Sequence, residues 1–444
     1  MARLFGTDGV RGVANTQLTC DLAFKLGQAA VAFQGTTILI GKDTRLSGDM
    51  LESSVAAGIM SMGGTALLAG IIPTPAIALL VRELHCDGGI VISASHNPPE
   101  YNGIKLFDGQ GFKLPDAVED EIEAFVARGG AAADELPAGD AVGVALPVED
   151  ACELYVAHAV STVADEGIDF AGLKVALDVG HGASCMTSPE ALRRLGAEVA
   201  VINEEFDGTD INVRCGSTHL EPLRELVAAT GADVGIAHDG DADRVMLVDA
   251  EGNEIDGDVV EAVCALDLKE RGLLAGNTAV STVMCNLGLA HAMRDAGIEL
   301  VQTKVGDRYV LEAMRAGGFV LGGEQSGHMI FLEYNSTGDG LVTALQFLAA
   351  CRRRGKSIAE AAAVMTRFPQ TLVNVHVNDK HAVDGNAAVQ AAVSAAEAEL
   401  GDSGRVLLRP SGTEPVVRVM VEAASAEEAD RHARAIADVV EREV

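Results

Sequence analysis

One local pattern, repeated three times, constrains the fold more than any other feature of the sequence. In each copy a short β-branched strand leads into a polar or glycine-containing loop, a helix-like stretch, a glycine-containing turn and a second strand. The copies cover residues 36–70, 173–203 and 277–306. Such a unit implies parallel strands joined by a crossover helix. The copies lie roughly 100–140 residues apart, whereas solenoid repeats are about 20–50 residues long, so the pattern predicts three similar α/β domains.

The last part of the chain follows a different pattern. Residues 371–378 alternate like a strand, and 382–400 form an alanine-rich helical run. Two further strand-like segments flank the loop 411–415. Ser425 and Glu428 have capping-box spacing at the start of a final helix. This mixture predicts a small α+β domain.

The predicted fold class is therefore α/β, with three similar α/β domains that have mixed or parallel sheets and a C-terminal α+β domain. A chain of 444 residues is long enough for about three to four domains. Linker-like segments occur at 129–148, 249–258 and 368–369. The predicted domains are 1–150, 151–254, 255–368 and 369–444.

Charge and cysteine content narrow the class of function. The chain has 65 Asp and Glu against 33 Lys and Arg, which argues against nucleic acid or an anionic membrane as partner. None of the eight cysteines forms a C-x-x-C pair, so we expect reduced, mostly buried thiols. The first residues contain no apolar signal segment, and the longest apolar stretch, 66–81, is broken by two prolines. We expect a cytoplasmic protein.

The first loop with chemical potential is Ser93-Ala94-Ser95-His96-Asn97-Pro98, which follows an apolar strand at 89–92. Ligands of α/β sheets bind beyond the carboxyl ends of strands, where Ser95 is expected to lie. A serine there can act as a nucleophile or carry a phosphoryl group. Lys105, ten residues on, is a candidate proton shuttle or phosphate clamp. The alternative is a turn in which polar side chains satisfy the backbone before a proline.

The second loop is Asp239-Gly240-Asp241-Ala242-Asp243-Arg244, between two strand-like runs. Three carboxylates at alternate positions can converge on one hard cation such as Mg²⁺ or Ca²⁺. An EF-hand needs Gly at loop position six and Glu at position twelve, where this sequence has Arg244 and Ala250. That interpretation fails. Arg244 is positioned to hold an anion, and the remaining alternative is a charged hairpin turn.

Two later loops are candidates for ligand binding. In 321–331, Glu324, Ser326 and His328 alternate, so an extended segment would present them on one face to sugar hydroxyls; a glycine-rich turn is the alternative. In 409–419, a Ser-Gly-Thr nest is flanked by two arginines, which suits a phosphate. A tight β-turn would explain the glycine there but not both arginines.

Basic residues are scarce, and many of them lie in or beside strand-ending, glycine-rich segments. We therefore predict a basic cleft for a small anion inside an acidic protein. The predicted residues of this cleft are Arg11, Lys42, Arg45, Lys105, Arg244, Lys304, Arg308, Arg409 and Arg418.

Together, SASHNP, DGDADR, GEQSGH and RPSGTEP resemble, in this order, the four signature loops of the α-D-phosphohexomutase superfamily, and the opening RLFGTDGVRG also matches. The resemblance covers the whole chain and implies four domains around a central cleft. It implies that Ser95 is a phosphoserine and that Asp239, Asp241 and Asp243 bind Mg²⁺ together with Ser95. The implied ligands of sugar and distal phosphate are Glu324, Ser326, Arg409, Ser411, Gly412, Thr413 and Arg418. Arg11, Lys105, Arg244 and His328 are the implied catalytic groups.

Gly323–His328 and Ser336–Gly340 most resemble the bacterial members that act on glucosamine phosphate. The resemblance implies interconversion of glucosamine 6-phosphate and glucosamine 1-phosphate in amino-sugar metabolism, toward peptidoglycan precursors. It also implies glucosamine 1,6-bisphosphate as intermediate and primer, in a monomer or homodimer. The alternatives are a glucose or mannose phosphate substrate, a non-catalytic sugar-phosphate sensor and a metal-dependent phosphatase.

Overall fold

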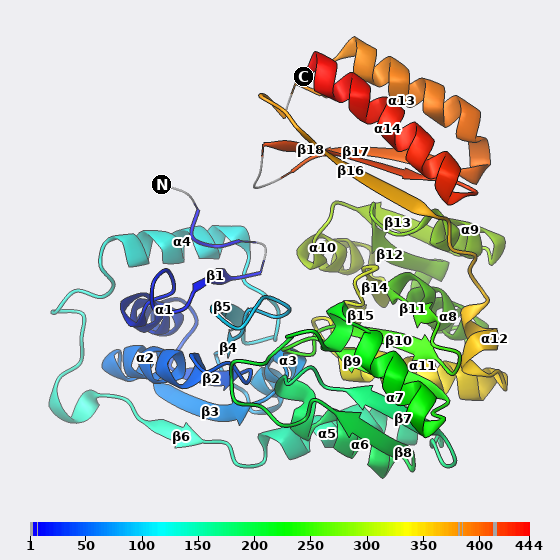
Figure 1. Cartoon of the computed structure of the whole chain (residues 1–444). Helices are drawn as coiled ribbons and strands as arrows, with labels where there is room; N and C mark the ends of the chain where they lie inside the picture. The colour runs from blue at the N-terminus through cyan, green and yellow to red at the C-terminus, as the bar shows by residue number, and fades with distance from the viewer. Residues whose placement is uncertain (1–2, 7, 381, 384, 412–414) are drawn as a thin grey trace. The chain divides into compact units, whose positions relative to one another are not determined.

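The computed structural model describes residues 3–6, 8–380, 382–383, 385–411 and 415–444. Contacts divide the chain into two compact units (Figure 1). The first unit comprises Met1–Met284 and Ile298–Val364, and the second comprises Cys285–Gly297 and Met365–Val444. The four domain boundaries given above stay a prediction. In the described part of the chain, no helix combines the length and apolar character needed to cross a bilayer.

The first sheet of unit 1 has six strands in the order β1-β5-β4-β2-β3-β6. Strand β2 lies parallel to both β3 and β4, which confirms the first predicted strand–helix–strand unit. Strand β5 runs antiparallel to both of its neighbours. The elements are β1 (Val10–Val13), α1 (Cys20–Phe33), β2 (Thr37–Lys42), α2 (Gly48–Ser61), β3 (Thr65–Ile71), α3 (Thr74–Glu83), β4 (Gly88–Ile92), β5 (Tyr101–Asp108), α4 (Asp116–Ala127) and β6 (Ala145–Pro147).

Helices cover both faces of this sheet, which explains why β2 is almost continuously apolar. Ile38 and Ile40 point into a core shared with residues of α1 and α2. Gly41 faces the opposite side, where a Cβ would come within 2.6 Å of Ile77 on α3. The carboxyl ends of β2 and β4 are therefore held rigidly from two sides, and the first candidate loop begins at the end of β4.

Helices α1 and α2 approach each other closely through two glycines. A Cβ on Gly27 would lie 2.2 Å from the carbonyl oxygen of Val55, and one on Gly58 would lie 2.0 Å from that of Phe24. Both distances are far below van der Waals contact. The two helices therefore pack backbone against backbone at these positions.

Gly58→Ala is expected to lower the free energy of unfolding by roughly 2 kcal/mol, although alanine is the better helix former by about 1 kcal/mol. The added methyl group must push α1 and α2 apart. Urea unfolding measures the loss. Gly385→Ala is the control, because a Cβ there meets no described heavy atom within 4 Å. Equal stability of the two variants would contradict the close approach.

The second and third sheets contain the other two predicted strand–helix–strand units, and both are confirmed. Strands β7 and β8 are parallel, as are β12 and β13. The sheet orders are β11-β10-β9-β7-β8 and β13-β12-β14-β15. The elements of unit 1 here are α5 (Ala151–Ala164), β7 (Lys174–Asp178), α6 (Ser188–Arg194), β8 (Glu198–Ile202), α7 (Glu221–Thr230), β9 (Val234–His238), β10 (Val245–Asp249), β11 (Glu254–Ile255), α8 (Gly257–Glu270), β12 (Thr278–Thr282), β13 (Glu299–Thr303), α10 (Asp307–Gly317), β14 (Leu321–Gly323), β15 (Met329–Phe331), α11 (Gly340–Arg354) and α12 (Ile358–Ala362).

The second unit is built on an antiparallel sheet in the order β16-β18-β17. Its helix α9 comes from the middle of the chain, between two strands of unit 1. Buried Glu422 joins α9 to the sheet, because its carboxylate accepts from the backbone N–H of Leu287 at 3.0 Å and from Arg405 Nε at 2.6 Å. The elements are α9 (Leu287–Asp295), β16 (Gln370–His376), α13 (Ala387–Leu400), β17 (Arg405–Pro410), β18 (Val416–Glu422) and α14 (Ala426–Glu443).

Several local predictions meet a clear outcome. The N-cap of α14 is confirmed, because Ser425 Oγ accepts from the Glu428 N–H at 3.2 Å. All eight cysteines are free and most are buried, as predicted. The linker prediction over 129–148 is wrong at its end, because β6 pairs there with β3. Helix α13 begins at Ala387, five residues later than the alanine-rich run, because Asn386 caps its first turn.

Candidate active site

Ser95 lies just beyond β4, where the sequence places it, and is 1% exposed. Its backbone is left-handed, with φ +52°. Its Oγ donates to Asp239 Oδ2 at 2.5 Å, although the two residues are 144 positions apart in sequence. The predicted serine loop and the predicted carboxylate loop therefore meet.

The three aspartates form one buried cluster, in the loop that joins β9 to β10. One ligand oxygen from each of Asp239, Asp241 and Asp243 lies within 4.8 Å of the others. Burial, and then the charges of Asp243 and Asp241, raise the pKa of Asp239 well above its ordinary value. Like charges this close repel unless a cation is present.

The donor set and its geometry fit a hard divalent cation. Asp241 Oδ2 already accepts hydrogen bonds from Thr74 Oγ1 at 2.6 Å and from Lys105 Nζ at 2.8 Å. Asp241 Oδ1 and Asp243 Oδ1 are buried and have no hydrogen-bond partner among the described residues. Oxygen ligands directed inward from a short loop are those that Mg²⁺ takes when substrate and water complete its shell.

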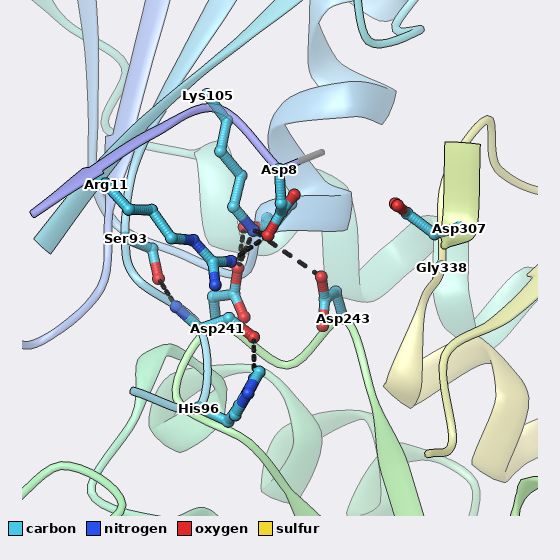
Figure 2. A network of polar contacts seen from close by, with 12 residues as sticks. Asp8, Arg11, Ser93, His96, Lys105, Asp241, Asp243, Asp307 and Gly338 are labelled. Atoms are coloured by element: carbon cyan, nitrogen blue, oxygen red, sulfur yellow. Dashed lines mark hydrogen bonds and ion pairs between the residues drawn. The ribbon is translucent and has the colours of Figure 1, made fainter. Parts of the chain in front are cut away.

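Lys105 crosses from β5 to the carboxylate cluster and is almost completely buried (Figure 2). Its Nζ lies 2.8 Å from Asp241 Oδ2, 3.1 Å from Asp8 Oδ2 and 3.7 Å from Asp243 Oδ2. Burial alone would lower the pKa of Lys105, but Asp241 and Asp8 outweigh it, and the pKa is raised. Lys105 is therefore a permanent cation in this arrangement.

Asp8 is a functional candidate that the sequence argument missed. It pairs with Arg11, with Lys105 and with Lys113, whose Nζ lies 2.5 Å from Asp8 Oδ1. Burial alone would raise the pKa of Asp8, but the three cations lower it well below its ordinary value. Its only sequence signal was the GTDGVRG run, which identifies no chemistry by spacing alone.

His328 reaches the same network from the loop before β15. Its Nδ1 lies 3.5 Å from Asp243 Oδ2, and its Nε2 lies 3.6 Å from Asp307 Oδ2, which also pairs with Lys113. Burial alone would lower the pKa of His328, but Asp243 outweighs it and the pKa is raised. Asp307 lies on this side of the network in Figure 2.

Arg244 and His96 complete the surroundings of Ser95. Arg244 Nε lies 3.8 Å from Asp243 Oδ1, and its backbone pairs with His328 across the loop. His96 Nδ1 lies 3.4 Å from Ser95 Oγ. Burial, helped by Arg244 and Arg11, lowers the pKa of His96 to about 4, so this imidazole is neutral at physiological pH.

The prediction that Glu324, Ser326 and His328 share one face of an extended segment is wrong. Residues 324–328 form the turn between β14 and β15, closed by a 3.0 Å hydrogen bond from the Glu324 N–H to the His328 carbonyl oxygen. Glu324 Oε1 accepts from the Gly306 N–H at 3.1 Å, whereas Ser326 is exposed. The glycine-rich turn that was the alternative is the observed structure.

The predicted phosphate loop lies in the second unit, between β17 and β18. Arg409 and Arg418 are direct cross-strand partners, an arrangement of like charges that is unfavourable without an anion. Burial, helped by Arg418, lowers the pKa of Arg409. Ser411 is buried, and Gly412 and Thr413 lie outside the described residues.

The predicted basic cleft is partly wrong, because Lys42, Arg45 and Arg308 pair with carboxylates outside the aspartate triad. Lys42 pairs with Asp49 and Glu52, Arg45 with Asp43, and Arg308 with Asp116 and Glu119. Lys304 lies over the ring of Tyr309 at 6.0 Å. The cations that contact the carboxylate cluster itself are Lys105, Arg244 and His328.

His238, the residue before the aspartate loop, predicts an acid sensitivity of the fold. It is fully buried, with Nδ1 3.1 Å from the Arg244 carbonyl oxygen and Nε2 3.0 Å from Ser188 Oγ. Burial lowers the pKa of His238 from 6.5 to about 4. Between these values the unfolded chain binds a proton that the folded chain does not, so stability is full above pH 6.5 and is lost as pH falls.

We expect the contribution of His238 to the free energy of unfolding to fall by about 3 kcal/mol between pH 7 and pH 4. Urea unfolding across this range measures it. In His238→Gln the curve of stability against pH should be flatter by that amount. An unchanged pH slope in the variant would assign the acid sensitivity to another group.

Four family models match consecutive parts of the chain. They are described as Phosphoglucomutase/phosphomannomutase, alpha/beta/alpha domains I, II and III and C-terminal domain. They match residues 2–132, 153–252, 256–368 and 372–439, respectively. These matches cover most of the chain in the order of the four signature loops.

Relatives and solved structures agree with these models. "Phosphoglucosamine mutase" of Clostridium novyi is 52% identical, with 99% of each chain covered, and that of Moorella thermoacetica is 53% identical over 96% of this chain and 97% of the relative. A Phosphoglucomutase/phosphomannomutase family protein from Burkholderia thailandensis has a TM-score of 0.84 at 24% identity, over 100% of this chain and 98% of the other. N-acetylphosphoglucosamine mutase of Aspergillus fumigatus, solved with GlcNAc-6P and magnesium, has a TM-score of 0.69 at 18% identity, over 99% and 95%. The chain therefore belongs to the phosphoglucomutase/phosphomannomutase family, in the branch of the phosphoglucosamine mutases.

Proposed function

We propose that the protein interconverts glucosamine 6-phosphate and glucosamine 1-phosphate, with Ser95 as the carrier of the phosphoryl group. The observation that carries the proposal is the 2.5 Å contact of Ser95 Oγ with Asp239, inside a triad built to hold a cation. The relatives named Phosphoglucosamine mutase, half identical over nearly the full chain, support the amino-sugar substrate.

The proposed metal is Mg²⁺, held by Asp239, Asp241, Asp243 and an oxygen of the Ser95 phosphate. When bound, Mg²⁺ offsets negative charge on the transferring phosphoryl group. The Oδ1 atoms of Asp241 and Asp243 are buried and accept no hydrogen bond from the described residues, which supports this assignment. Lys105 supplies a second positive charge at Asp241 Oδ2, so the cluster is neutralised from two directions.

The phosphate transfers balance without a second substrate. O1 of glucosamine 6-phosphate loses its proton and attacks the phosphorus of phosphoSer95, the Ser95 Oγ–P bond breaks, Ser95 Oγ takes up a proton, and the 1,6-bisphosphate forms. After the bisphosphate turns over, Ser95 Oγ loses its proton and attacks the phosphorus at O6, the O6–P bond breaks, O6 takes up a proton, and glucosamine 1-phosphate leaves. Such a bisphosphate is also the proposed primer, because it can phosphorylate an empty Ser95 in the same way.

The remaining roles go to side chains around this centre. Lys105 and Arg11, both paired with Asp8, are proposed to stabilise charge as phosphate moves. His328 is the proposed proton carrier, since its buried ring lies between the carboxylates of Asp243 and Asp307. Glu324 and Ser326 are proposed to bind sugar hydroxyls. We propose that the distal phosphate is bound by Arg409, Ser411, Gly412, Thr413 and Arg418.

The substrate assignment is tested by kcat/KM for glucosamine 6-phosphate and glucose 6-phosphate, measured side by side with Mg²⁺ and trace 1,6-bisphosphate. We expect a preference for the amino sugar of at least about 100-fold, the scale of discrimination between near-isosteric substituents. Equal kcat/KM values for the two sugar phosphates would leave the proposed mutase reaction in place but contradict glucosamine phosphate as the preferred substrate. Release of inorganic phosphate without isomerisation would indicate a phosphatase.

A further inference from the structure

The backbone of Ser95 is held by residues that have no role in the chemistry described above. A non-glycine residue with φ near +52° is disfavoured and persists only where its surroundings hold it. The carbonyl oxygen of Ser95 accepts from Arg45 Nη2 and from Asn212 Nδ2, each at 2.9 Å. These donors come from the loop after β2 and from the loop after β8, far from Ser95 in sequence.

Arg45 uses all five of its N–H groups, and its side chain is 0% exposed. Nε donates to Asp43 Oδ2 at 2.9 Å. The four remaining hydrogens reach backbone carbonyl oxygens along the serine loop, those of Ser95 (2.9 Å), Asn97 (2.8 Å), Pro98 (2.5 Å) and Tyr101 (2.9 Å). A guanidinium has five donors in a fixed planar geometry, so it can hold several carbonyl groups of one loop at once. An ammonium group has only three donors and cannot do this.

A second chain of hydrogen bonds links the backbone N–H of Ser95 to Arg45. It donates to Ser93 Oγ at 2.9 Å, and Ser93 Oγ donates to Asp43 Oδ2 at 2.6 Å. The Asp43 carboxylate also accepts from Arg45. The backbone N–H and carbonyl oxygen of Ser95 are therefore both linked to the buried ion pair of Asp43 and Arg45, the N–H through Ser93 and the carbonyl oxygen directly.

The third support links this loop to the aspartate loop. Gly240, between two of the triad aspartates, lies so close to Ser95 that a Cβ there would be 2.7 Å from the Ser95 carbonyl oxygen and 2.8 Å from Asn212 Nδ2. Asn212 is itself buried and left-handed, with φ +60°. The Ser95 carbonyl oxygen thus lies where three loops meet. They are the loop of residues 93–98, the loop after β8 that contains Asn212 and the loop of residues 239–244.

We propose that Arg45, with Asn212, is a positioning residue that fixes the Ser95 backbone so that the phosphoryl group on Oγ faces both the triad and the acceptor hydroxyl. The inference rests on the proposed role of Ser95 as phosphoryl carrier. All five N–H groups of the buried Arg45 side chain donate within the protein, so we expect its loss to leave substrate affinity in place and to misalign the transfer. A misplacement of about 1 Å is enough to slow an aligned reaction by about 10²-fold.

The test compares Arg45→Lys, Asn212→Ala and a control, Arg353→Lys. Arg353 is also largely buried and pairs with Asp267 and Glu166. Turnover is expressed per Ser95 phosphate, counted by intact-mass spectrometry on the folded fraction from gel filtration, so unfolded or unphosphorylated enzyme does not enter the rate. For Arg45→Lys we expect kcat to fall about 100-fold with KM for glucosamine 6-phosphate within about threefold of the wild type, and for Asn212→Ala a fall of about tenfold.

Arg353→Lys should lose thermal stability but keep kcat per phosphorylated site. A kcat within twofold of the wild type in Arg45→Lys would overturn the inference, as would a loss confined to stability or to KM. If Arg45→Lys does not fold, Asn212→Ala decides, and wild-type kcat in that variant overturns the inference. A wild-type enzyme without phosphate on Ser95 or without mutase activity would overturn the proposed function, and the inference with it.

Discussion

Ser95→Ala is expected to reduce mutase turnover by roughly 10⁴-fold or more, the scale seen when a covalent nucleophile is removed. Alanine lacks the oxygen that donates to Asp239 and that carries the phosphoryl group. The fold should persist, because the backbone bonds of the serine loop do not involve this oxygen. Conversion of glucosamine 6-phosphate, followed by product analysis, measures the loss.

The control for this prediction is Ser54→Ala on α2. Ser54 Oγ donates to the carbonyl oxygen of Met50 one turn earlier, so turnover should stay within about twofold of the wild type. Mutase activity above a trace in Ser95→Ala would remove Ser95 from the phosphoryl path. An equal loss in both variants would point to the fold rather than to chemistry.

Asp241→Asn is expected to lower turnover by at least about 100-fold and to shift the Mg²⁺ requirement upward by a similar factor. Asparagine keeps the shape of the side chain and its acceptor for Thr74, but it removes one of three negative charges and the ion pair with Lys105. Excess Mg²⁺ should therefore restore only part of the activity. A series of rates against Mg²⁺ concentration measures both effects.

A structural aspartate separates the loss of a metal ligand from the loss of a buried charge. Asp249, at the end of β10, is also buried, and its Oδ1 accepts from the backbone N–H groups of Glu251 and Asn253. Asp249→Asn should lower stability and leave the Mg²⁺ dependence of the rate unchanged. If Asp241→Asn behaves in the same way, Asp241 is not a ligand.

The parts of the site that the sequence predicts are those in which one short segment carries the chemistry. The three aspartates alternate within five residues after an apolar run, and Ser95 follows another such run. Strand–helix–strand units place these strand ends at one edge of each sheet. Local pattern was therefore enough to predict Ser95 beyond a sheet edge and a carboxylate cluster in one loop.

The ion pairs that surround Asp8 join residues that are distant in sequence and leave no local pattern. Asp8 and Lys113 are 105 positions apart, and Lys113 and Asp307 are 194 apart. Each of these residues, read alone, is an ordinary surface charge. Their meeting depends on how three sheets pack in unit 1, which periodicity along the chain does not encode.

Two predictions were wrong because they considered each residue without the residues around it in sequence or in space. The alternation of Glu324, Ser326 and His328 suits a strand, but Gly323 before the segment and Gly327 within it favour the tight turn that is observed. Arg45 was predicted to bind an anion because of its position after a strand. Four of its five N–H groups instead donate to backbone carbonyl oxygens of a buried loop and the fifth donates to Asp43, which shows how much a loop without secondary structure depends on one side chain.

The origin of helix α9 has a practical consequence for dividing the protein into fragments. Because α9 belongs to the second unit although both flanking strands belong to the first, the chain passes from one unit to the other three times. A fragment that starts at Met365 would lack α9 and leave Glu422 without the Leu287 N–H, although it would still contain Arg405. A stop codon at the same place would leave α9 attached to the first unit without its sheet. Truncation is therefore a poor way to separate the units, and an insertion tag or a protease site in this protein is better placed elsewhere than at residue 365.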